Sequence, residues 1–115
     1  MIRKSHEMEK EVRERMRDGI GTVEVLHVFR SKELKGRTRL FARLRLPAGS
    51  SIGFHRHEGE EEIFYILSGT GEVSEGGSLS TLVPGDAVLT GDGGGHSIAN
   101  AGSVPLEFLA VILVY

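Results

Sequence analysis

Three histidines and one glutamate are spaced so that their side chains can meet. His55 and His57 are two residues apart, Glu62 follows after a short loop, and His96 stands much farther along the chain. On a β-strand, residues i and i+2 leave the same face with Cα atoms about 6.6 Å apart. Two imidazole nitrogens at this spacing can reach one ion at about 2.1 Å each. A hairpin after His57 would return Glu62 beside them, so these four residues predict a metal site.

The donor types narrow the kind of ion. Neutral imidazoles with one carboxylate suit first-row transition metals better than Ca or Mg. We expect one divalent ion per chain, and Mn, Fe, Co, Ni, Cu and Zn all accept this donor set. Four ligands leave two positions of a six-coordinate ion open for a small molecule. The nearby Glu58, Glu60 and Glu61 are interpreted as a solvated loop, His6 as a surface residue and His27 as an ordinary strand residue.

The rest of the chain must supply strands that bring these residues together. From residue 20 onward the apolar pattern has period two, and residues 39–46 alternate apolar side chains with arginines. Short segments of this kind between turns predict about eight or nine strands, hence an all-β barrel or sandwich. Residues 1–18 differ, because a thin apolar stripe and i, i+4 ion pairs favour a helix from His6 to Arg17, capped by Ser5. We therefore expect a helical extension over 1–20 and a β-barrel domain over 21–115.

The spacing resembles the two motifs of the cupin family. The first motif, G-x5-H-x-H-x(3,4)-E-x6-G, is matched by Gly49, His55, His57, Glu62 and Gly69. The second, G-x5-P-x-G-x2-H-x3-N, is matched by Gly85, Gly93, His96 and Asn100, with Gly91 in place of the usual proline. The resemblance covers roughly residues 25–114 and implies a single-domain cupin, a double-stranded β-helix (jelly-roll barrel).

The same resemblance assigns roles within the motifs. It implies that the three histidines and Glu62 are metal ligands and that the motif glycines and Asn100 are structural turn positions. Gly91 is expected to loosen the loop before His96.

Strand parity predicts the wall around the metal. If Glu62 points inward, alternate residues on its strand and on three others do so too. The predicted lining is Ala42, Phe64, Ile66, Ile98, Phe108 and Ala110. No arginine or lysine falls on this lining by parity; Arg39, Arg43 and Arg45 fall outside, and Arg56 points away from the histidines. The predicted pocket is therefore mostly apolar.

Several functions fit such a site. One is a mononuclear metalloenzyme, a dioxygenase or a decarboxylase, acting on a small oxygen-rich molecule that chelates the metal. Another is a non-catalytic sensor or binding module for a metal or small molecule. A third, a sugar isomerase, is less favoured because a phosphate group would need cations in the pocket. The sequence assigns no catalytic residue beyond the predicted ligands.

Composition sets the remaining expectations. The chain has 115 residues and a net charge of −2, which suits one globular domain and gives no electrostatic case for nucleic acid. It has no cysteine and no long apolar run, so we expect a cytoplasmic protein that does not enter a membrane. Few amides and no thiols favour a thermostable protein. The apolar segments 104–115 and 22–29 favour a homodimer.

Overall fold

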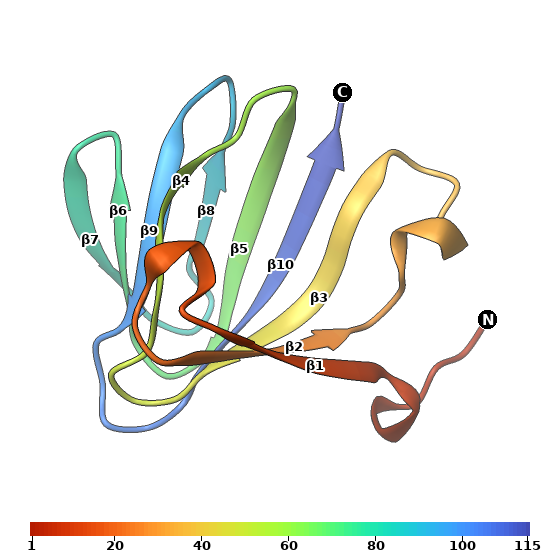
Figure 1. The fold of residues 1–115 in the computed structure, drawn as a ribbon, viewed down its shortest axis with the longest axis horizontal. Helices are drawn as coiled ribbons and strands as arrows, with labels where there is room; N and C mark the ends of the chain where they lie inside the picture. Colours follow the sequence, from red (N-terminus) through yellow and green to blue (C-terminus); the bar gives the residue numbers. More distant parts are fainter.

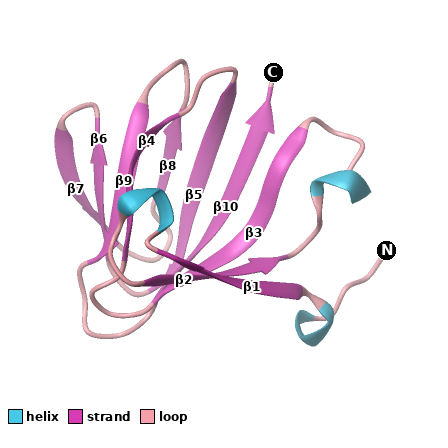
Figure 2. Cartoon of the chain, viewed as in Figure 1, coloured by secondary structure: helices cyan, strands magenta, loops and turns pink.

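Ten antiparallel β-strands form almost all of the regular structure (Figures 1 and 2). The computed structural model describes residues 1–115. The strands are β1 (Glu9–Glu14), β2 (Thr22–His27), β3 (Thr38–Leu46), β4 (Ser51–Arg56), β5 (Glu60–Ser68), β6 (Gly71–Glu75), β7 (Ser78–Leu82), β8 (Ala87–Thr90), β9 (Gly95–Asn100) and β10 (Leu106–Val114). Three 3₁₀ turns complete the set: η1 (Ser5–Glu7), η2 (Met16–Asp18) and η3 (Ser31–Glu33). The expected all-β class is confirmed.

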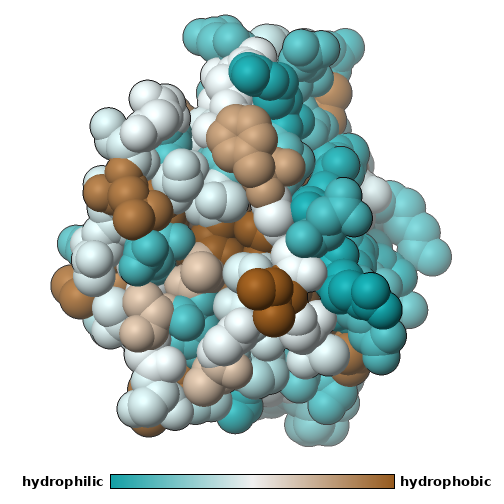
Figure 3. All heavy atoms as spheres, turned by 60° about the vertical axis from the view of Figure 1, so that its left-hand side comes forward, coloured by the Kyte–Doolittle hydropathy of each residue, from teal (hydrophilic) through white to brown (hydrophobic).

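The strands form two sheets that face each other. The larger sheet has the order β1-β2-β3-β10-β5-β8, and the smaller has the order β4-β9-β6-β7. Between them lies a core of 13 buried apolar residues contributed by both sheets. Period-two alternation builds this core, since Ala42, Leu44 and Leu46 of β3 are buried while Arg45 between them is exposed. On the face drawn in Figure 3, hydrophobic side chains appear as separate spots among polar ones.

A β-bulge in β4 sets the direction of the first motif histidine. In the β4–β9 pairing, Ile52 lies opposite Ile98 and His55 lies opposite His96, so β4 carries one extra residue between these pairs. A bulge of this kind changes side-chain parity along its strand. Ile52 and His55 are an odd number of residues apart, yet Ile52 is buried in the core and His55 lines the inner cavity. The bulge therefore places the metal-site histidines on the core side of β4.

The helix expected over residues 6–17 is wrong. Residues 9–14 form β1, which pairs with β2 at the edge of the larger sheet, and only the short turns η1 and η2 flank it. Ion pairs at i, i+4 stabilise an isolated helix by only about 0.2–0.5 kcal/mol each, and a helix of about 12 residues is marginal in water. Backbone pairing with β2 and packing of Met16 on the core outweigh them.

No helix in the structure has the length and apolar character needed to cross a bilayer.

Candidate metal centre

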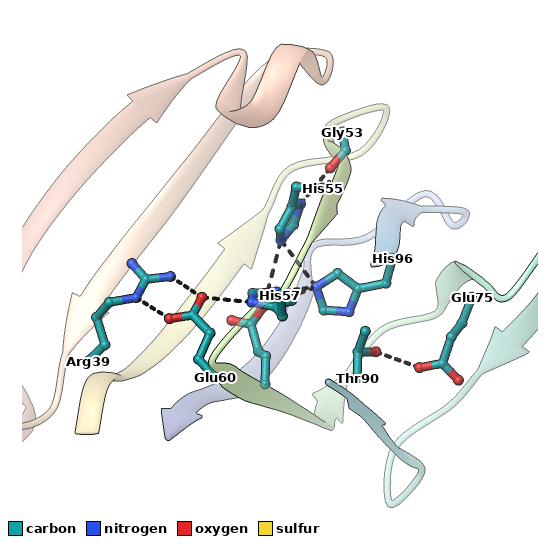
Figure 4. Close-up of polar contacts among 9 residues, drawn as sticks. Arg39, Gly53, His55, His57, Glu60, Glu75, Thr90 and His96 are labelled. Atoms are coloured by element: carbon teal, nitrogen blue, oxygen red, sulfur yellow. Dashed lines mark hydrogen bonds and ion pairs between the residues drawn. The ribbon is translucent and has the colours of Figure 1, made fainter. Parts of the chain in front are cut away.

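The four predicted ligands come together at one point inside the barrel (Figure 4). His55 lies near the end of β4, His57 follows directly after that strand, Glu62 comes from β5 and His96 from β9. The Nε2 atom of His96 lies 3.1 Å from Nε2 of His55, 3.1 Å from Nε2 of His57 and 3.0 Å from Oε1 of Glu62. One ligating atom from each residue lies within 4.8 Å of all the others. The four residues whose spacing predicted a metal site therefore do bring their ligating atoms together.

Hydrogen bonds orient two of the rings with their Nε2 lone pairs toward this point. His55 Nδ1 lies 2.8 Å from the backbone oxygen of Gly53, and His57 Nδ1 lies 2.9 Å from Oε1 of Glu60. A carbonyl and an ionised carboxylate can only accept, so each Nδ1 carries a proton, and in the neutral ring Nε2 then presents its lone pair. Lone pairs that face one another this closely repel unless a cation lies between them. The donor set therefore fits a divalent transition metal, and a partner on the second ring nitrogen is typical of metal-binding histidines.

Burial makes this cluster of three histidines and Glu62 energetically unfavourable unless a cation lies among them. His57 and His96 are 1% and 0% exposed, and Glu62 is 4% exposed. Burial raises the pKa of the Glu62 carboxyl, but the adjacent imidazoles of His55 and His96 lower it by more, so the net shift is downward. Glu62 is therefore a carboxylate at neutral pH. An ionised carboxylate at this depth requires a cationic or hydrogen-bonded partner.

Glu60 takes part in the site, contrary to its interpretation as a solvated loop residue. Its carboxylate accepts the His57 Nδ1 proton and also accepts a two-point contact from Arg39, at 2.7 and 2.8 Å. The hydrogen bond from Arg39 is the main reason that the pKa of Glu60 is lowered to about 2. A line of contacts thus runs from Arg39 through Glu60 to His57 (Figure 4). The sequence offered one signal for this contact: Glu60 follows His57 by three residues, so the two side chains can meet across the loop.

His96 is held by packing. Its ring stacks on Phe64 with centroids 4.6 Å apart and planes at 13°, and Phe64 in turn meets Phe108 edge-on at 4.8 Å. His96 Nδ1 is buried and has no hydrogen-bond partner. The loop before His96 is tied to the end of β4, because the His57 backbone bonds to Gly93 and Gly94. The loosening expected from Gly91 is opposed by these bonds.

A cavity of about 420 Å³ opens over this group, and its wall differs from the predicted one. Of the six predicted lining residues only Phe64 faces the cavity, beside apolar residues such as Leu40 and Leu44. The other five are buried in the core: Ala42, Ile66, Ile98, Phe108 and Ala110. Parity correctly gave the inward face of each strand, but it carries no information about depth. These five residues belong to the buried core and do not line the cavity.

The predicted absence of cations from the wall is also wrong. Four arginines are among the residues that line the cavity: Arg13, Arg17, Arg30 and Arg39. The first two come from β1 and η2, where a helix was expected, and Arg30 comes from the loop after β2. Arg39 was placed outside by parity, but its long side chain reaches Glu60. Arg43, Arg45 and Arg56 are absent from this lining, as expected.

His27 is a pocket residue that the sequence interpretation missed. It is 4% exposed and lines the cavity, and its Nε2 atom lies 2.6 Å from Oε1 of Glu11. Hydrogen bonds from Arg13 and then from His27 lower the pKa of Glu11 to about 2, so Glu11 is ionised and the His27 Nε2 carries a proton. Arg30 lies 3.1 Å from the same nitrogen, which cannot accept while it donates to Glu11. The alternation of Val23, Val25 and His27 on β2 was the signal for its inward direction.

The motif turn residues occupy tight positions. The four motif glycines have positive φ angles: Gly49, Gly69, Gly85 and Gly93. At Gly69, with φ +81°, an added Cβ would lie 2.5 Å from the Pro105 oxygen, so both the conformation and the space exclude a side chain. Asn100 is buried, and its amide donates to the backbone oxygens of Leu46 and Val104.

Comparisons with known proteins agree with this geometry. The family model described as "Cupin domain" matches residues 42–112. The chain belongs to the cupin family. It is 45% identical over 114 residues to a protein of Thermotoga maritima named oxalate-binding protein, covering 99% of this cupin and 94% of the relative. An uncharacterized protein of Methanocaldococcus jannaschii is 33% identical over 93 residues, covering 81% and 72% of the two chains.

Solved structures show the same fold. A crystal structure from Thermotoga maritima, described as a predicted oxalate decarboxylase, matches this cupin with a TM-score of 0.95 and 44% identity, covering 100% of both chains. A protein from Thermus thermophilus matches with a TM-score of 0.69 at 24% identity, covering 96% of this cupin and 87% of that chain. The second likeness concerns the fold alone.

Proposed function

We propose that this cupin binds one divalent transition metal through His55, His57, Glu62 and His96, and binds a small chelating carboxylate of the oxalate type at that metal. The observation that carries the proposal is the convergence of four ligating atoms, three of them from residues that line a cavity of about 420 Å³. A bound ion would supply Lewis acidity and open coordination positions for carboxylate oxygens. The relatives named for oxalate support this ligand class.

The cationic wall supports an anionic ligand. Arg13, Arg17, Arg30 and Arg39 can donate hydrogen bonds to carboxylate oxygens, and Arg is well suited to planar oxyanions. Glu62, itself a proposed ligand, is the single acidic residue among those that line the cavity. A sugar-phosphate ligand was disfavoured because the predicted wall had no cations, and the four arginines remove that objection. The oxalate class is preferred because two relatives are named for oxalate.

The binding function is tested on protein stripped with a chelator, reconstituted with Mn, Co, Ni or Zn, desalted and analysed for metal content. We expect one ion per chain in the wild type and marked loss in His57→Ala and His96→Ala. His6→Ala is the matched control, because His6 is exposed and lies outside the group. Calorimetry with oxalate should then give heat of binding only with the metal-loaded wild type. Failure of the wild type to retain any of these metals would overturn the proposal.

A second candidate, decarboxylation of the bound acid, is favoured by His27. When the C–C bond breaks and CO₂ leaves, the remaining fragment keeps the electron pair and needs a proton. The Nδ1 atom of His27 has no hydrogen-bond partner and is not fully buried, while Glu11 holds Nε2. In its doubly protonated form, His27 could deliver the Nδ1 proton inside the cavity. Formate release from oxalate by the metal-loaded wild type, lost in His27→Gln with oxalate binding retained, would support this; no release from the wild type would leave binding alone.

A further inference from the structure

One of the four pocket arginines has no partner. Arg13 pairs with Glu11 at 2.8 Å, Arg30 with Glu9 at 2.5 Å and Arg39 with Glu60 at 2.7 Å. The guanidinium of Arg17 makes no hydrogen bond or ion pair in the structure, and Arg17 is one of the residues that line the cavity together with His55, His57 and Glu62. A paired arginine must give up a carboxylate before it binds another anion at full strength. Arg17 is the guanidinium already free to do so.

Close backbone contacts fix the turn that carries Arg17. A Cβ atom added at Gly53 would lie 1.9 Å from the Arg17 oxygen, and one added at Gly19 would lie 2.2 Å from the Ser51 oxygen. Only glycine at both positions allows turn η2 to pack this closely on β4. The Ile20 oxygen also accepts a hydrogen bond from the Ser51 backbone at 2.8 Å. The turn is thus fastened to the strand that carries His55 and His57.

The backbone of Arg17 also indicates that its surroundings determine its position. Arg17 has φ 54° and ψ 39°, the left-handed conformation, which is unfavourable for a residue other than glycine. Such a conformation persists where the neighbouring structure enforces it. Here the close packing of the Arg17 backbone on Gly53 enforces it. Gly53 also contacts the metal group, because its backbone oxygen accepts the His55 Nδ1 proton. Arg17 and the metal group are therefore linked through a single residue of β4.

The charges around the cavity specify the ligand further. The four arginines are balanced by four carboxylates, those of Glu9, Glu11, Glu60 and Glu62. A bound divalent ion would add two positive charges to this wall, which favours an anionic ligand over a neutral one.

We propose that, within this class of chelating carboxylates, the site prefers a dicarboxylate longer than oxalate, with a hydroxyl or oxo group next to one carboxylate. That end chelates the metal, and the far carboxylate binds Arg17, which makes Arg17 the specificity-determining residue of the site. The inference rests on the proposed metal and carboxylate function. A cavity of about 420 Å³ lies within the size range of about 300–1,000 Å³ that is usual for small-molecule sites, so it has room for a second carboxylate.

The test compares two acids that differ only at the far end. Malate and 2-hydroxybutyrate have the same chelating group and carbon count, and a carboxylate in malate replaces a methyl group. With Mn²⁺-loaded wild type in calorimetry, we expect malate to bind about 10- to 100-fold more tightly, the effect of a charge-assisted hydrogen bond. Arg17→Gln should abolish this preference by weakening malate alone. Arg15→Gln, an exposed arginine of the same segment outside the cavity wall, should retain it.

The outcomes separate this inference from the proposed function. If the wild type retains Mn²⁺ and binds both acids equally, or if Arg17→Gln keeps the preference for malate, the role of Arg17 is refuted and the metal site stands. If the wild type retains no metal, the proposed function fails first. Thermal unfolding of Arg17→Gln and Arg15→Gln, expected to match the wild type because both side chains are exposed, guards against a folding defect.

Discussion

Replacing Glu60 by alanine should weaken metal binding although Glu60 is not one of the four proposed ligands. Its carboxylate accepts the Nδ1 proton of His57 at 2.9 Å and is itself held by two hydrogen bonds from Arg39. The carboxylate fixes both the tautomer and the orientation of His57. It also raises the basicity of the ring, so that Nε2 is a stronger electron-pair donor to a metal ion. In Glu60→Ala the proton of His57 is free to move to Nε2, the atom that would bind the ion.

The expected size of the effect follows from this position. Loss of an outer partner of a metal-binding histidine typically weakens metal affinity about 10- to 100-fold, or about 1.4–2.8 kcal/mol. Breaking the Arg39 contact adds little, because the Arg39 side chain is 49% exposed and water can replace the carboxylate. Glu60→Gln keeps an oxygen that can accept from His57, so its loss should be smaller than that of Glu60→Ala.

The assay is a competition titration of Co²⁺ or Zn²⁺ between the protein and a chelator at neutral pH. Because the pKa of Glu60 is lowered to about 2 from 4.5, its folded-state stabilisation is complete above the ordinary pKa and is lost as the pH falls toward 2. Neutral pH therefore compares fully ionised Glu60 with its variants. Glu58→Ala, an exposed change in the same loop, is the control and should leave the affinity unchanged. Equal affinity in wild type and Glu60→Ala would refute the idea that Glu60 orients His57.

Three other outcomes follow from the packing. Phe64→Ala, which removes the ring stacked on His96, should lower the free energy of unfolding by about 3–5 kcal/mol in urea denaturation; a smaller loss would show that the core closes around the gap. Asn100→Ala leaves two backbone oxygens without a donor and should cost about 1–3 kcal/mol, measured in the same way. The exposed Tyr65, Leu67 and Leu89 on the larger sheet favour a homodimer, so light scattering should give twice the monomer mass, and a monomeric mass would exclude it.

The metal group was predictable because its information is local. Alternation on a strand brings His55 and His57 to one face, and a short hairpin returns Glu62, so two neighbouring strands settle most of the geometry. His96 follows from its match to the second motif, and the structure places it opposite His55. The bulge before His55 was not predicted, but it did not disturb the spacing between His55 and His57, because it lies upstream of both.

The cavity wall was not predictable in the same way because it depends on pairing between distant segments. The charge pattern of residues 9–14 suits a helix as well as a strand. The strand forms because its backbone pairs with the edge of β2. Once β1 forms, Arg13 lines the cavity and Glu11 contacts His27. Turn η2 then adds Arg17 to the lining. Parity on the other strands could not reveal these residues, since none of them lies on those strands.

The two parts of the site come from different parts of the chain, and this has a consequence for specificity. The family match covers residues 42–112, which contain all four proposed metal ligands. The four arginines of the wall and His27 all precede residue 42. The segment within the family match thus supplies the proposed metal centre, while the arginines that we propose to select the ligand lie outside it. The preceding segment supplies the charges facing that centre, so exchanging residues 1–41 between cupins should transfer ligand preference while leaving metal retention intact.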